Sequence, residues 1–282
     1  MKPKKRTGML KGLRSLRKFV LEPEFFIIAG LIYLAASAFA ALDPGMQALN
    51  PRISITSITF LVFIFGLSSY YFGLKTRVNI TNFWLKEDLR GKGIFFVINH
   101  FSYIDGIVAG SIFPFVFIGK IELKNWPLLG IMIQLSETVF VNRVNILNIK
   151  YELEKVAFLL KNNVNVILFP EGTSSDGKTA IPFKSSFFAA PLQSGCKIVP
   201  LTIKYRKINN LEINDYNKDL VYWYGDMEFF SHFIGVLGLT SIEVELKVNP
   251  PLQVRDVQDQ ILSVKRKYVS DLSQEIIRSQ LD

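Results

Sequence analysis

Two uncharged apolar segments near the N-terminus stand out from the hydrophobic pattern of the rest of the chain. Residues 25–42 and 53–74 carry no charged side chain over 18 and 22 residues. As helices they would reach about 27 and 33 Å, close to the hydrocarbon thickness of a bilayer. The short segment 43–52 between them contains two prolines and a glycine. The pattern therefore predicts a membrane-embedded two-helix hairpin over residues 21–75.

This hairpin pattern leaves two alternatives open. A basic segment, an apolar run and the triplet Ala38-Phe39-Ala40 also fit a cleaved signal peptide, although a second apolar run follows at once. The Ser, Thr and Tyr residues within 53–74 suit helices that lie in the membrane interface as well as helices that span the bilayer. Spanning and shallow insertion are therefore both compatible with the sequence.

Beyond residue 90, short apolar runs alternate with stretches of helical period. Apolar runs typical of buried strands occupy 94–98, 116–118, 138–141, 164–169 and 198–203. Helices are expected at 104–111 and 146–161, and as a broken stretch over 122–135. This alternation predicts an α/β domain, residues 76–282, with a mainly parallel central sheet flanked by helices.

The last segment of this domain, residues 254–281, is charged and helix-prone. Its apolar residues form one expected stripe, made of Val257, Ile261, Val264, Tyr268 and Leu272. We therefore expect a C-terminal amphipathic helix that packs on the domain or lies on a surface.

The net charge of +9 comes from one end of the chain. Residues 1–18 contain eight Lys and Arg side chains and no acidic one, which leaves 25 basic residues against 24 acidic ones in the rest. A basic arm over residues 1–20 is typical of a segment that faces anionic lipid, whereas a nucleic-acid binder would carry its charge on the folded body. Lys75 and Arg77 flank the other end of the hairpin, so the positive-inside rule places both ends and the domain in the cytoplasm.

Cysteine and histidine are too scarce for most metal sites. The single cysteine, Cys196, excludes an intramolecular disulfide and a multi-cysteine zinc or iron–sulfur site. The two histidines, His100 and His232, argue against a His-rich metal site. His232 lies in the aromatic segment 229–233 and is expected to be packed rather than catalytic.

The first of three unusual loops is NHFSYID at 99–105, which follows a predicted strand. In α/β sheets, functional residues gather at the carboxyl ends of the parallel strands. His100 and Asp105 can meet if the histidine lies in the loop and the aspartate in the first turn of the next helix. Asp105 would then orient the imidazole, which would act as a general base toward a hydroxyl. The alternative is that Asp105 binds backbone N–H groups in a capping box with Ser102, and both can hold at once.

The other two loops contain groups that suit an anion. FPEGTSSDG at 169–177 offers hydroxyls and exposed N–H groups beside a glycine, although Glu171 would repel a phosphate unless it holds a neighbouring cation or a substrate hydroxyl. FVNR at 140–143 ends in Arg143, a residue type suited to bidentate phosphate recognition. Taken singly, a polar surface turn and an ordinary surface arginine explain these two loops at least equally well.

Five blocks in this order resemble the glycerolipid acyltransferase family, which includes the 1-acylglycerol-3-phosphate acyltransferases. NHFSYID matches the signature N-H-x-x-x-x-D, and FPEGTSS resembles the block F-P-E-G-T-R-S. Three further segments of this chain resemble the family's remaining blocks: IGKIELKNWPLLG together with FVNR, PFKSSFF at 182–188, and VPLTI at 199–203. The resemblance covers residues 75–250.

The resemblance implies acyl transfer from a fatty acyl thioester, on coenzyme A or acyl carrier protein, to the hydroxyl of a lysophospholipid, with 1-acylglycerol-3-phosphate as the expected acceptor in phospholipid biosynthesis. It implies His100 as the base and Asp105 as its orienter, without a cofactor, a metal or a covalent intermediate. The residues it implies for substrate binding are Asn99, Lys120, Arg143, Glu171, Gly172, Thr173, Ser174 and Lys184. It also implies a phospholipid membrane as partner, no nucleic acid, and a place at the cytoplasmic side of a bacterial inner membrane.

One position departs from the family pattern in a way that concerns the acceptor. Ser174 stands where the third block usually has arginine, so a cation for the headgroup is missing, and Lys178 or Lys184 would have to replace it. The acceptor could then be lysophosphatidic acid, another lysophospholipid or an amino-acid-based lyso-lipid. Two further classes stay open: a hydrolase that uses the same dyad on water, and a non-catalytic lipid-binding protein with this fold.

Overall fold

The computed structural model describes residues 74–80, 93–110, 115–125, 130, 133, 138–142, 146–178, 181–252 and 261–281. The expected basic arm, nearly all of the expected hairpin and Arg143 lie outside these residues. Within the described residues, no helix combines the length and the apolar character needed to cross a bilayer.

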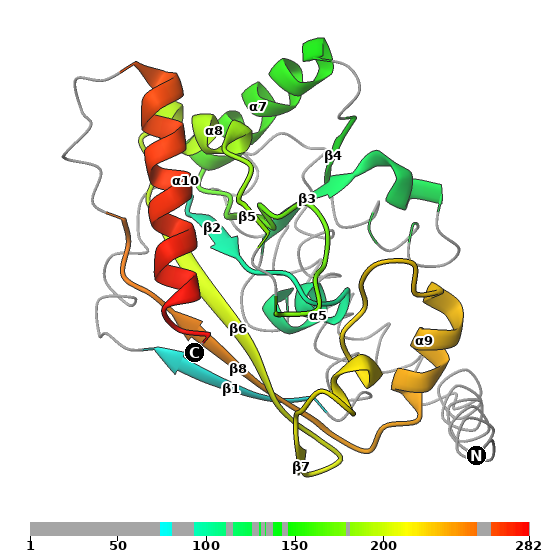
Figure 1. Ribbon diagram of the computed structural model, residues 1–282. Coiled ribbons are helices and arrows are strands. Elements are labelled where there is room, and N and C mark those ends of the chain that lie inside the picture. The colour runs from blue at the N-terminus through cyan, green and yellow to red at the C-terminus, as the bar shows by residue number, and fades with distance from the viewer. Residues whose placement is uncertain are drawn as a thin grey trace, which may run out of the picture.

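The described residues form a mixed sheet of eight strands (Figure 1). The strands are β1 (Leu74–Ile80), β2 (Phe95–Ile98), β3 (Val116–Lys120), β4 (Val139–Val141), β5 (Val166–Leu168), β6 (Ile198–Ile208), β7 (Leu211–Glu212) and β8 (Ile242–Val248). Their order is β1-β8-β6-β2-β5-β3-β4, and β7 pairs with the end of β6. The neighbours from β6 to β4 are parallel, whereas β8 is antiparallel to β6 and parallel to β1.

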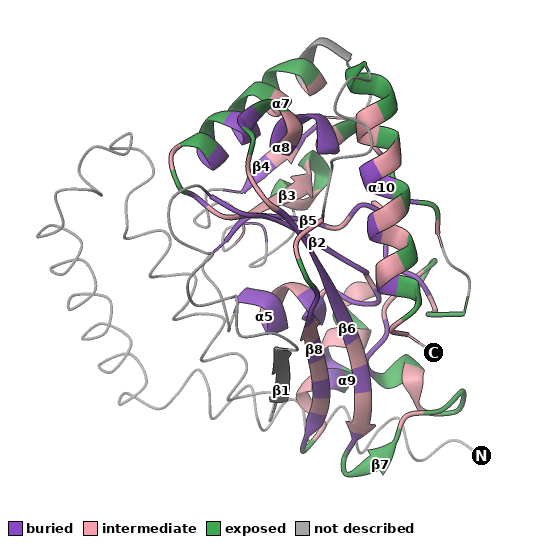
Figure 2. Ribbon diagram, turned by 90° about the vertical axis from the view of Figure 1, so that its left-hand side faces the viewer, coloured by how far each residue is buried: buried purple, intermediate pink, exposed green. Residues whose placement is uncertain are grey.

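Helices cover both faces of this sheet (Figure 2). One face packs against α7 (Ile146–Lys161), α8 (Ala189–Ser194) and α10 (Leu262–Arg278), and the other against α5 (Ile104–Gly110) and α9 (Phe229–Leu237). Three short 3₁₀ helices complete the described elements: η2 (Ile121–Asn125), η3 (Ser186–Phe188) and η4 (Lys218–Leu220). Along β2, Phe96 belongs to the core on the α5 side, and Phe95 and Val97 belong to the core on the α7 side. Burial of both faces explains why this strand reads as a continuous apolar run.

The sequence pattern is confirmed for the centre of the sheet. Each of the five predicted strands is present, and the predicted helix over 146–161 is α7. β1, β7 and β8 were not predicted. β7 and β8 pair antiparallel with β6, and the sheet as a whole is mainly parallel, as predicted. β8 alternates between buried and half-buried positions, as expected for a strand whose second face is only partly covered.

The C-terminal helix is present, but the predicted apolar stripe is wrong at its start: Tyr268 packs half-buried against the core, whereas the earlier members do not, and Val257 lies outside the described residues. Ile261 and Val264 are 70% and 43% exposed, and the buried positions of α10 include Val269, Ser273 and Ile277. Serine is short enough to let the helix approach the domain closely, and the Ser273 hydroxyl donates to the carbonyl of Val269 at 2.6 Å. A polar side chain that satisfies its own hydrogen bond can therefore belong to a buried face that a hydrophobic stripe does not reveal.

The parallel pairing determines where the chemistry collects. β2 is parallel to β5, β5 to β3, and β3 to β4, so all four strands end at the same edge of the sheet. The segments 99–105 and 169–177 follow β2 and β5 directly, and residues 140–142 comprise the end of β4 and the residue after it. The fold therefore brings together loops that lie up to 70 residues apart, at the edge that the sequence predicted.

Candidate active site

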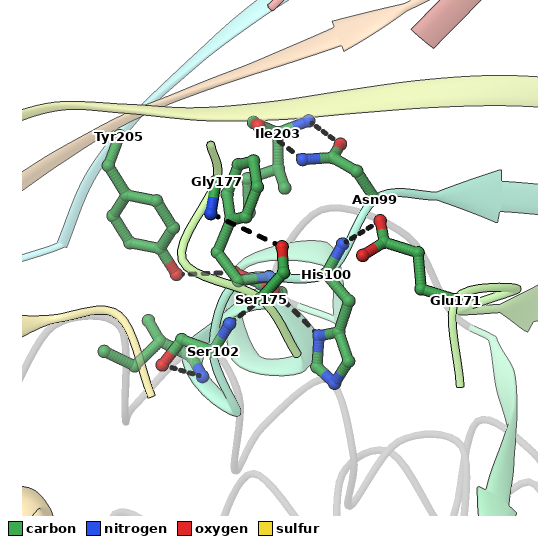
Figure 3. A network of polar contacts seen from close by, with 11 residues as sticks. Asn99, His100, Ser102, Glu171, Ser175, Gly177, Ile203 and Tyr205 are labelled. Atoms are coloured by element: carbon green, nitrogen blue, oxygen red, sulfur yellow. Dashed lines mark hydrogen bonds and ion pairs between the residues drawn. The ribbon is translucent and has the colours of Figure 1, made fainter. Parts of the chain in front are cut away.

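His100 and Asp105 meet where β2 passes into α5. Nδ1 of His100 lies 2.9 Å from Oδ2 of Asp105, and the same oxygen accepts the backbone N–H groups of Phe101 at 2.6 Å and Ser102 at 2.9 Å. Oδ1 of Asp105 accepts the hydroxyl of Tyr205 at 2.6 Å (Figure 3). The dyad and the capping interaction therefore coexist: one carboxylate ends the loop, starts the helix and holds the imidazole.

The His100 ring is fixed but still accessible. Asp105 is fully buried, whereas the His100 side chain is 21% exposed. The ring packs on Phe169 with 4.3 Å between the ring centres and a tilt of 33°. Asp105 engages Nδ1, and Figure 3 shows the other ring nitrogen turned away from this network. Nε2 is therefore the nitrogen that can face a substrate.

The loop after β5 holds the backbone of His100 from both sides. The N–H of His100 donates to Oε1 of Glu171 at 3.1 Å, and the N–H of Ser175 donates to the carbonyl of His100 at 3.0 Å. Glu171 is only 5% exposed, and this burial raises its pKa to about 8, although the positive charge of Arg278 lowers it in part. Glu171 therefore supports the histidine from behind.

A cleft of about 380 Å³ opens in front of the dyad. His100 and the segment Gly172–Ser174 form its polar side. Most of the remaining lining comes from α5 and the residue before it, from β3 and from η2, together with Trp223 and Gly225. It includes Tyr103, Ile107, Phe117, Ile118, Lys120, Leu123 and Phe169. A mainly apolar cleft with a few convergent polar groups suits an amphiphilic molecule that carries a polar headgroup.

The structure brings together some of the residues implied for substrate binding and separates others. Lys120, Gly172, Thr173 and Ser174 line the same cleft as His100.

Asn99 and Lys184 lie elsewhere. Asn99 is buried, its amide donates to the carbonyl of Ile203 at 3.0 Å, and its carbonyl accepts the N–H of Ile203 at 2.8 Å, so it joins β2 to β6. Lys184 lines a neighbouring pocket of about 210 Å³, which shares Ile118 and Phe169 with the cleft.

Lys178 does not supply the positive charge that the family pattern has at position 174. Lys178 is an exposed side chain, and its ammonium lies 2.9 Å from a carboxylate oxygen of Asp215. Ser174 itself lines the cleft. Among the described residues of the lining, Lys120 is the side chain with a permanent positive charge.

Two tyrosines at the site were not foreseen as functional. Tyr205 reaches Asp105 from β6, across 100 positions of sequence, and no local motif could have indicated this contact. Tyr103 lies inside the NHFSYID segment and lines the cleft, and its hydroxyl lies 3.0 Å from Nδ1 of His232. His232 is packed, as expected: its Nε2 is buried without a hydrogen-bond partner in the described part of the chain, and burial lowers its pKa.

The described residues hold no cluster of three or more His, Cys, Asp or Glu side chains that could bind a metal ion. The site therefore offers a base, a carboxylate that orients it, a backbone-rich loop and one lysine. That set can activate a hydroxyl and accommodate an anionic or polar headgroup.

Comparison with known proteins gives three kinds of match. A family model described as Acyltransferase matches residues 78–204. A lyso-ornithine lipid O-acyltransferase of Rhizobium meliloti (strain 1021) is 31% identical over 216 residues, which cover 74% of this chain and 70% of that protein. A second protein with this description, from Brucella abortus (strain 2308), is 33% identical over 171 residues, or 58% of this chain and 64% of the relative, just under two thirds of its length.

Proteins that act on a phosphate-containing acceptor match as well. A 1-acyl-sn-glycerol-3-phosphate acyltransferase of Neisseria gonorrhoeae is 34% identical over 113 residues, which cover 40% of this chain and 44% of that protein. The crystal structure of the 1-acyl-sn-glycerophosphate acyltransferase PlsC from Thermotoga maritima is similar with a TM-score of 0.55 and 20% identity, and the match covers 96% of this chain and 97% of that one. The structural match shows a shared mixed α/β fold with a mostly parallel sheet.

Proposed function

Because the chain belongs to the glycerolipid acyltransferase family, we propose that it moves a fatty acyl group from an acyl thioester, carried by coenzyme A or acyl carrier protein, to the hydroxyl of a lyso-lipid. The observation that carries this proposal is the His100–Asp105 pair: His100 lines a mainly apolar cleft, and its second ring nitrogen points away from Asp105 (Figure 3). The apolar walls suit an acyl chain, and the polar side at Gly172–Ser174 suits a headgroup.

The dyad can carry out the reaction in a direct displacement. Nε2 of His100 removes the proton from the acceptor hydroxyl while its oxygen attacks the thioester carbonyl, and Asp105 stabilises the imidazolium that forms. The new C–O bond gives a tetrahedral intermediate, which expels the thiolate as the C–S bond breaks. The imidazolium returns its proton to the thiolate, so the products are the acylated lipid and the free thiol. Neither a metal nor a covalent acyl-enzyme is needed for this sequence of steps.

For the acceptor, 1-acylglycerol-3-phosphate is the first candidate, as expected from the sequence resemblance. A lyso-ornithine lipid is a second candidate, and two observations favour it. Ser174 replaces the arginine that would bind a phosphate, and Lys178, which could have replaced it, is paired with Asp215 at the surface. In addition, the Rhizobium relative described as a lyso-ornithine lipid O-acyltransferase is 31% identical over 74% of this chain, whereas a 1-acyl-sn-glycerol-3-phosphate acyltransferase of Salmonella typhimurium that covers 70% of this chain is 28% identical.

We also propose that the protein works at the cytoplasmic side of the inner membrane, where a lyso-lipid acceptor would be dissolved. The basic arm and the apolar segments within residues 1–75 support this location through lipid attraction and insertion. Fractionation of cells that express the full chain and a chain without residues 1–73 tests it. The full chain should remain with the membrane fraction after a salt wash, and the shortened chain should be released.

The experiment that tests the function is an acyl-transfer assay on the full chain in detergent, with labelled acyl-coenzyme A and acyl-acyl carrier protein as donors. The acceptors are lysophosphatidic acid, lyso-ornithine lipid and lysophosphatidylethanolamine. Wild type should form the diacyl product, and His100→Ala should lose about 10²–10⁴-fold in rate, as expected for a general base.

The second histidine gives a matched control. His232→Gln removes the imidazole that lies outside the cleft lining, so transfer should stay within a few-fold of wild type. Release of free fatty acid without a diacyl lipid would support the hydrolase alternative instead. If no product forms with any donor and acceptor, the remaining interpretation is a lipid-binding protein without catalytic activity.

A further inference from the structure

We propose that Tyr205 is a positioning residue of the reaction, whose hydroxyl holds Asp105 in the geometry that orients His100. This inference rests on the proposed function, because it concerns the same dyad. Tyr205 lies in β6, beyond the blocks that resemble the family, and it does not line the cleft. Its effect on the reaction would therefore pass entirely through Asp105.

The hydrogen bonds to Asp105 are distributed unevenly between its two oxygens. Oδ2 accepts three groups, from His100, Phe101 and Ser102. Oδ1 accepts only the Tyr205 hydroxyl among the described residues, at 2.6 Å. Both side chains are buried, at 0% and 1% exposure, so solvent does not replace a lost partner. Without this hydroxyl, one oxygen of a buried carboxylate would be unpaired, and the carboxylate would be free to turn away from the imidazole or to bind a proton.

The direction of this hydrogen bond is fixed by the surroundings of the phenol. Burial raises the pKa of Tyr205 well above its ordinary value, and the negative charge of Asp105 raises it further. The phenol therefore keeps its proton at any pH at which the enzyme would work. A permanent donor faces Oδ1, which favours the ionised form of the carboxylate that the imidazolium needs.

Aromatic packing fixes the phenol ring in place. Tyr205 meets Tyr222 edge-on, with 5.4 Å between ring centres, and Tyr222 stacks on Phe101 at 4.9 Å with only 10° between the ring planes. Phe101 in turn donates its backbone N–H to Asp105. The same three rings thus connect β6 to the loop that holds His100. A phenylalanine at position 205 would keep this packing and remove only the oxygen.

The hydroxyl should also set the proton affinity of the dyad. The titratable groups that interact with Asp105 are His100, Glu171 and the phenols of Tyr205 and Tyr222, and burial keeps both phenols protonated. Loss of the donor destabilises the ionised carboxylate beside a neutral imidazole. A carboxylate with one donor fewer attracts a proton more strongly, both at Oδ1, which has lost its partner, and on the imidazole that faces Oδ2.

The test compares wild type with Tyr205→Phe and the matched control Tyr222→Phe, each as the full chain in detergent. Tyr222→Phe removes a hydroxyl from the same stack without removing a hydrogen bond to Asp105. For Tyr205→Phe we expect kcat to fall about tenfold to a hundredfold with little change in KM, less than for loss of the base itself. The acid limb of its kcat/KM profile should move up by about one pH unit, the size expected for a lost hydrogen bond to a charged group. Tyr222→Phe should show neither effect.

A second readout separates failure of this inference from failure of the proposed function. The chain has two histidines, so ¹³C labelling of the imidazoles gives two resonances, which His100→Ala assigns. The pH titration of the His100 resonance needs no substrate, and its midpoint should move upward in Tyr205→Phe and stay in place in Tyr222→Phe. If wild type transfers no acyl group but the His100 midpoint still moves in Tyr205→Phe and not in Tyr222→Phe, the proposed function is wrong and the effect of Tyr205 on the dyad is supported.

Several outcomes would overturn the inference. They are an unchanged kcat and pH profile in Tyr205→Phe, or an equal change in both variants, which would indicate general loosening of the aromatic stack. Thermal unfolding of each variant shows whether it is folded. If Tyr205→Phe does not fold, the wild-type protein still decides the matter: the hydroxyl proton of Tyr205 should give a slowly exchanging downfield resonance, and its absence would refute the hydrogen bond.

Discussion

Replacement of Asp105 by asparagine separates the charge of the dyad from its shape. The amide has the size of the carboxylate, and it has one oxygen and one NH₂ group where the carboxylate has two oxygens. If the amide oxygen takes the place of Oδ2, it still accepts from Phe101, Ser102 and His100, and the NH₂ group faces the Tyr205 hydroxyl, which can then act as acceptor. The opposite orientation would set the NH₂ group against three donors. The orientation with the amide oxygen in place of Oδ2 is therefore favoured, and His100 keeps its proton on Nδ1.

The loss in rate then comes from the missing negative charge. With Nδ1 and Oδ2 2.9 Å apart, the centres of an imidazolium and a carboxylate would lie about 4 Å from each other, where attraction is worth about 4 kcal/mol at an effective dielectric constant near 20. That energy corresponds to about a 10³-fold loss in kcat. Stability should change by less than about 2 kcal/mol, because weaker hydrogen bonds are offset by the removal of a buried charge.

The assay measures kcat with saturating donor and acceptor, and thermal unfolding measures stability. Asp219→Asn is the matched control: the same chemical change is made on an exposed side chain that accepts the Tyr224 hydroxyl, away from the cleft lining. The control should keep nearly full activity. A loss of less than tenfold in Asp105→Asn would refute the idea that the carboxylate stabilises an imidazolium, and a loss accompanied by unfolding would mean that the hydrogen bonds to the amide were misjudged.

Three further predictions follow from other parts of the site. Burial raises the pKa of Glu171 from 4.5 in the unfolded chain to about 8 in the folded one, so between these pH values the folded state binds one proton more than the unfolded state. The free energy of unfolding should therefore fall as the pH rises from 4.5 to 8. Denaturant titrations at several pH values should show this slope in wild type and lose it in Glu171→Gln. Ser174→Arg should raise the ratio of kcat/KM for lysophosphatidic acid over that for lyso-ornithine lipid, and an unchanged ratio would mean that position 174 does not contact the headgroup. Gly177 and Gly225 both have a positive φ, at 76° and 59°, and an alanine at either costs about 1–2 kcal/mol of stability through its backbone. At Gly177 the new Cβ would also lie 3.0 Å from the Tyr222 ring, whereas at Gly225 it would meet no atom within 4 Å, so Gly177→Ala should lower the melting temperature further than Gly225→Ala.

The centre of the fold could be predicted from sequence because its strands are buried on both faces. Runs such as 94–98 and 166–169 are uniformly apolar and are separated by a stretch of helical period, and this combination is typical of parallel α/β sheets. β8 carries charged residues at alternate positions, and β1 directly follows an uncharged segment, so neither shows that signal. The stripe expected for α10 was wrong because Ser270 and Ser273 occupy its buried face while Ile261 is exposed.

The contact between His100 and Asp105 could be predicted because the two residues lie five positions apart. Such a pair needs only a loop and one helical turn to meet, and both are encoded locally by the end of β2 and the start of α5. The contacts that hold the pair are of another kind. Glu171 reaches the N–H of His100 from 71 residues away, and Tyr205 reaches Asp105 from 100 residues away. Contacts of this separation depend on which strands become neighbours, and that follows from packing of the whole sheet rather than from any short motif.

The same distinction applies to residues that were assigned to the substrate from the motifs alone. A motif conserves the order of residues, but each residue in it can face a different direction, since successive side chains of an extended segment point to opposite sides. Asn99 directly precedes His100 and yet turns into the sheet, where both of its polar groups pair with Ile203. In the loop after β5, Gly172, Thr173 and Ser174 line the cleft, whereas Glu171 supports the backbone behind it. Specificity for the acceptor should therefore be sought at the lining residues Ser174 and Lys120, while residues of the same loops that turn away from the cleft hold the backbone of His100.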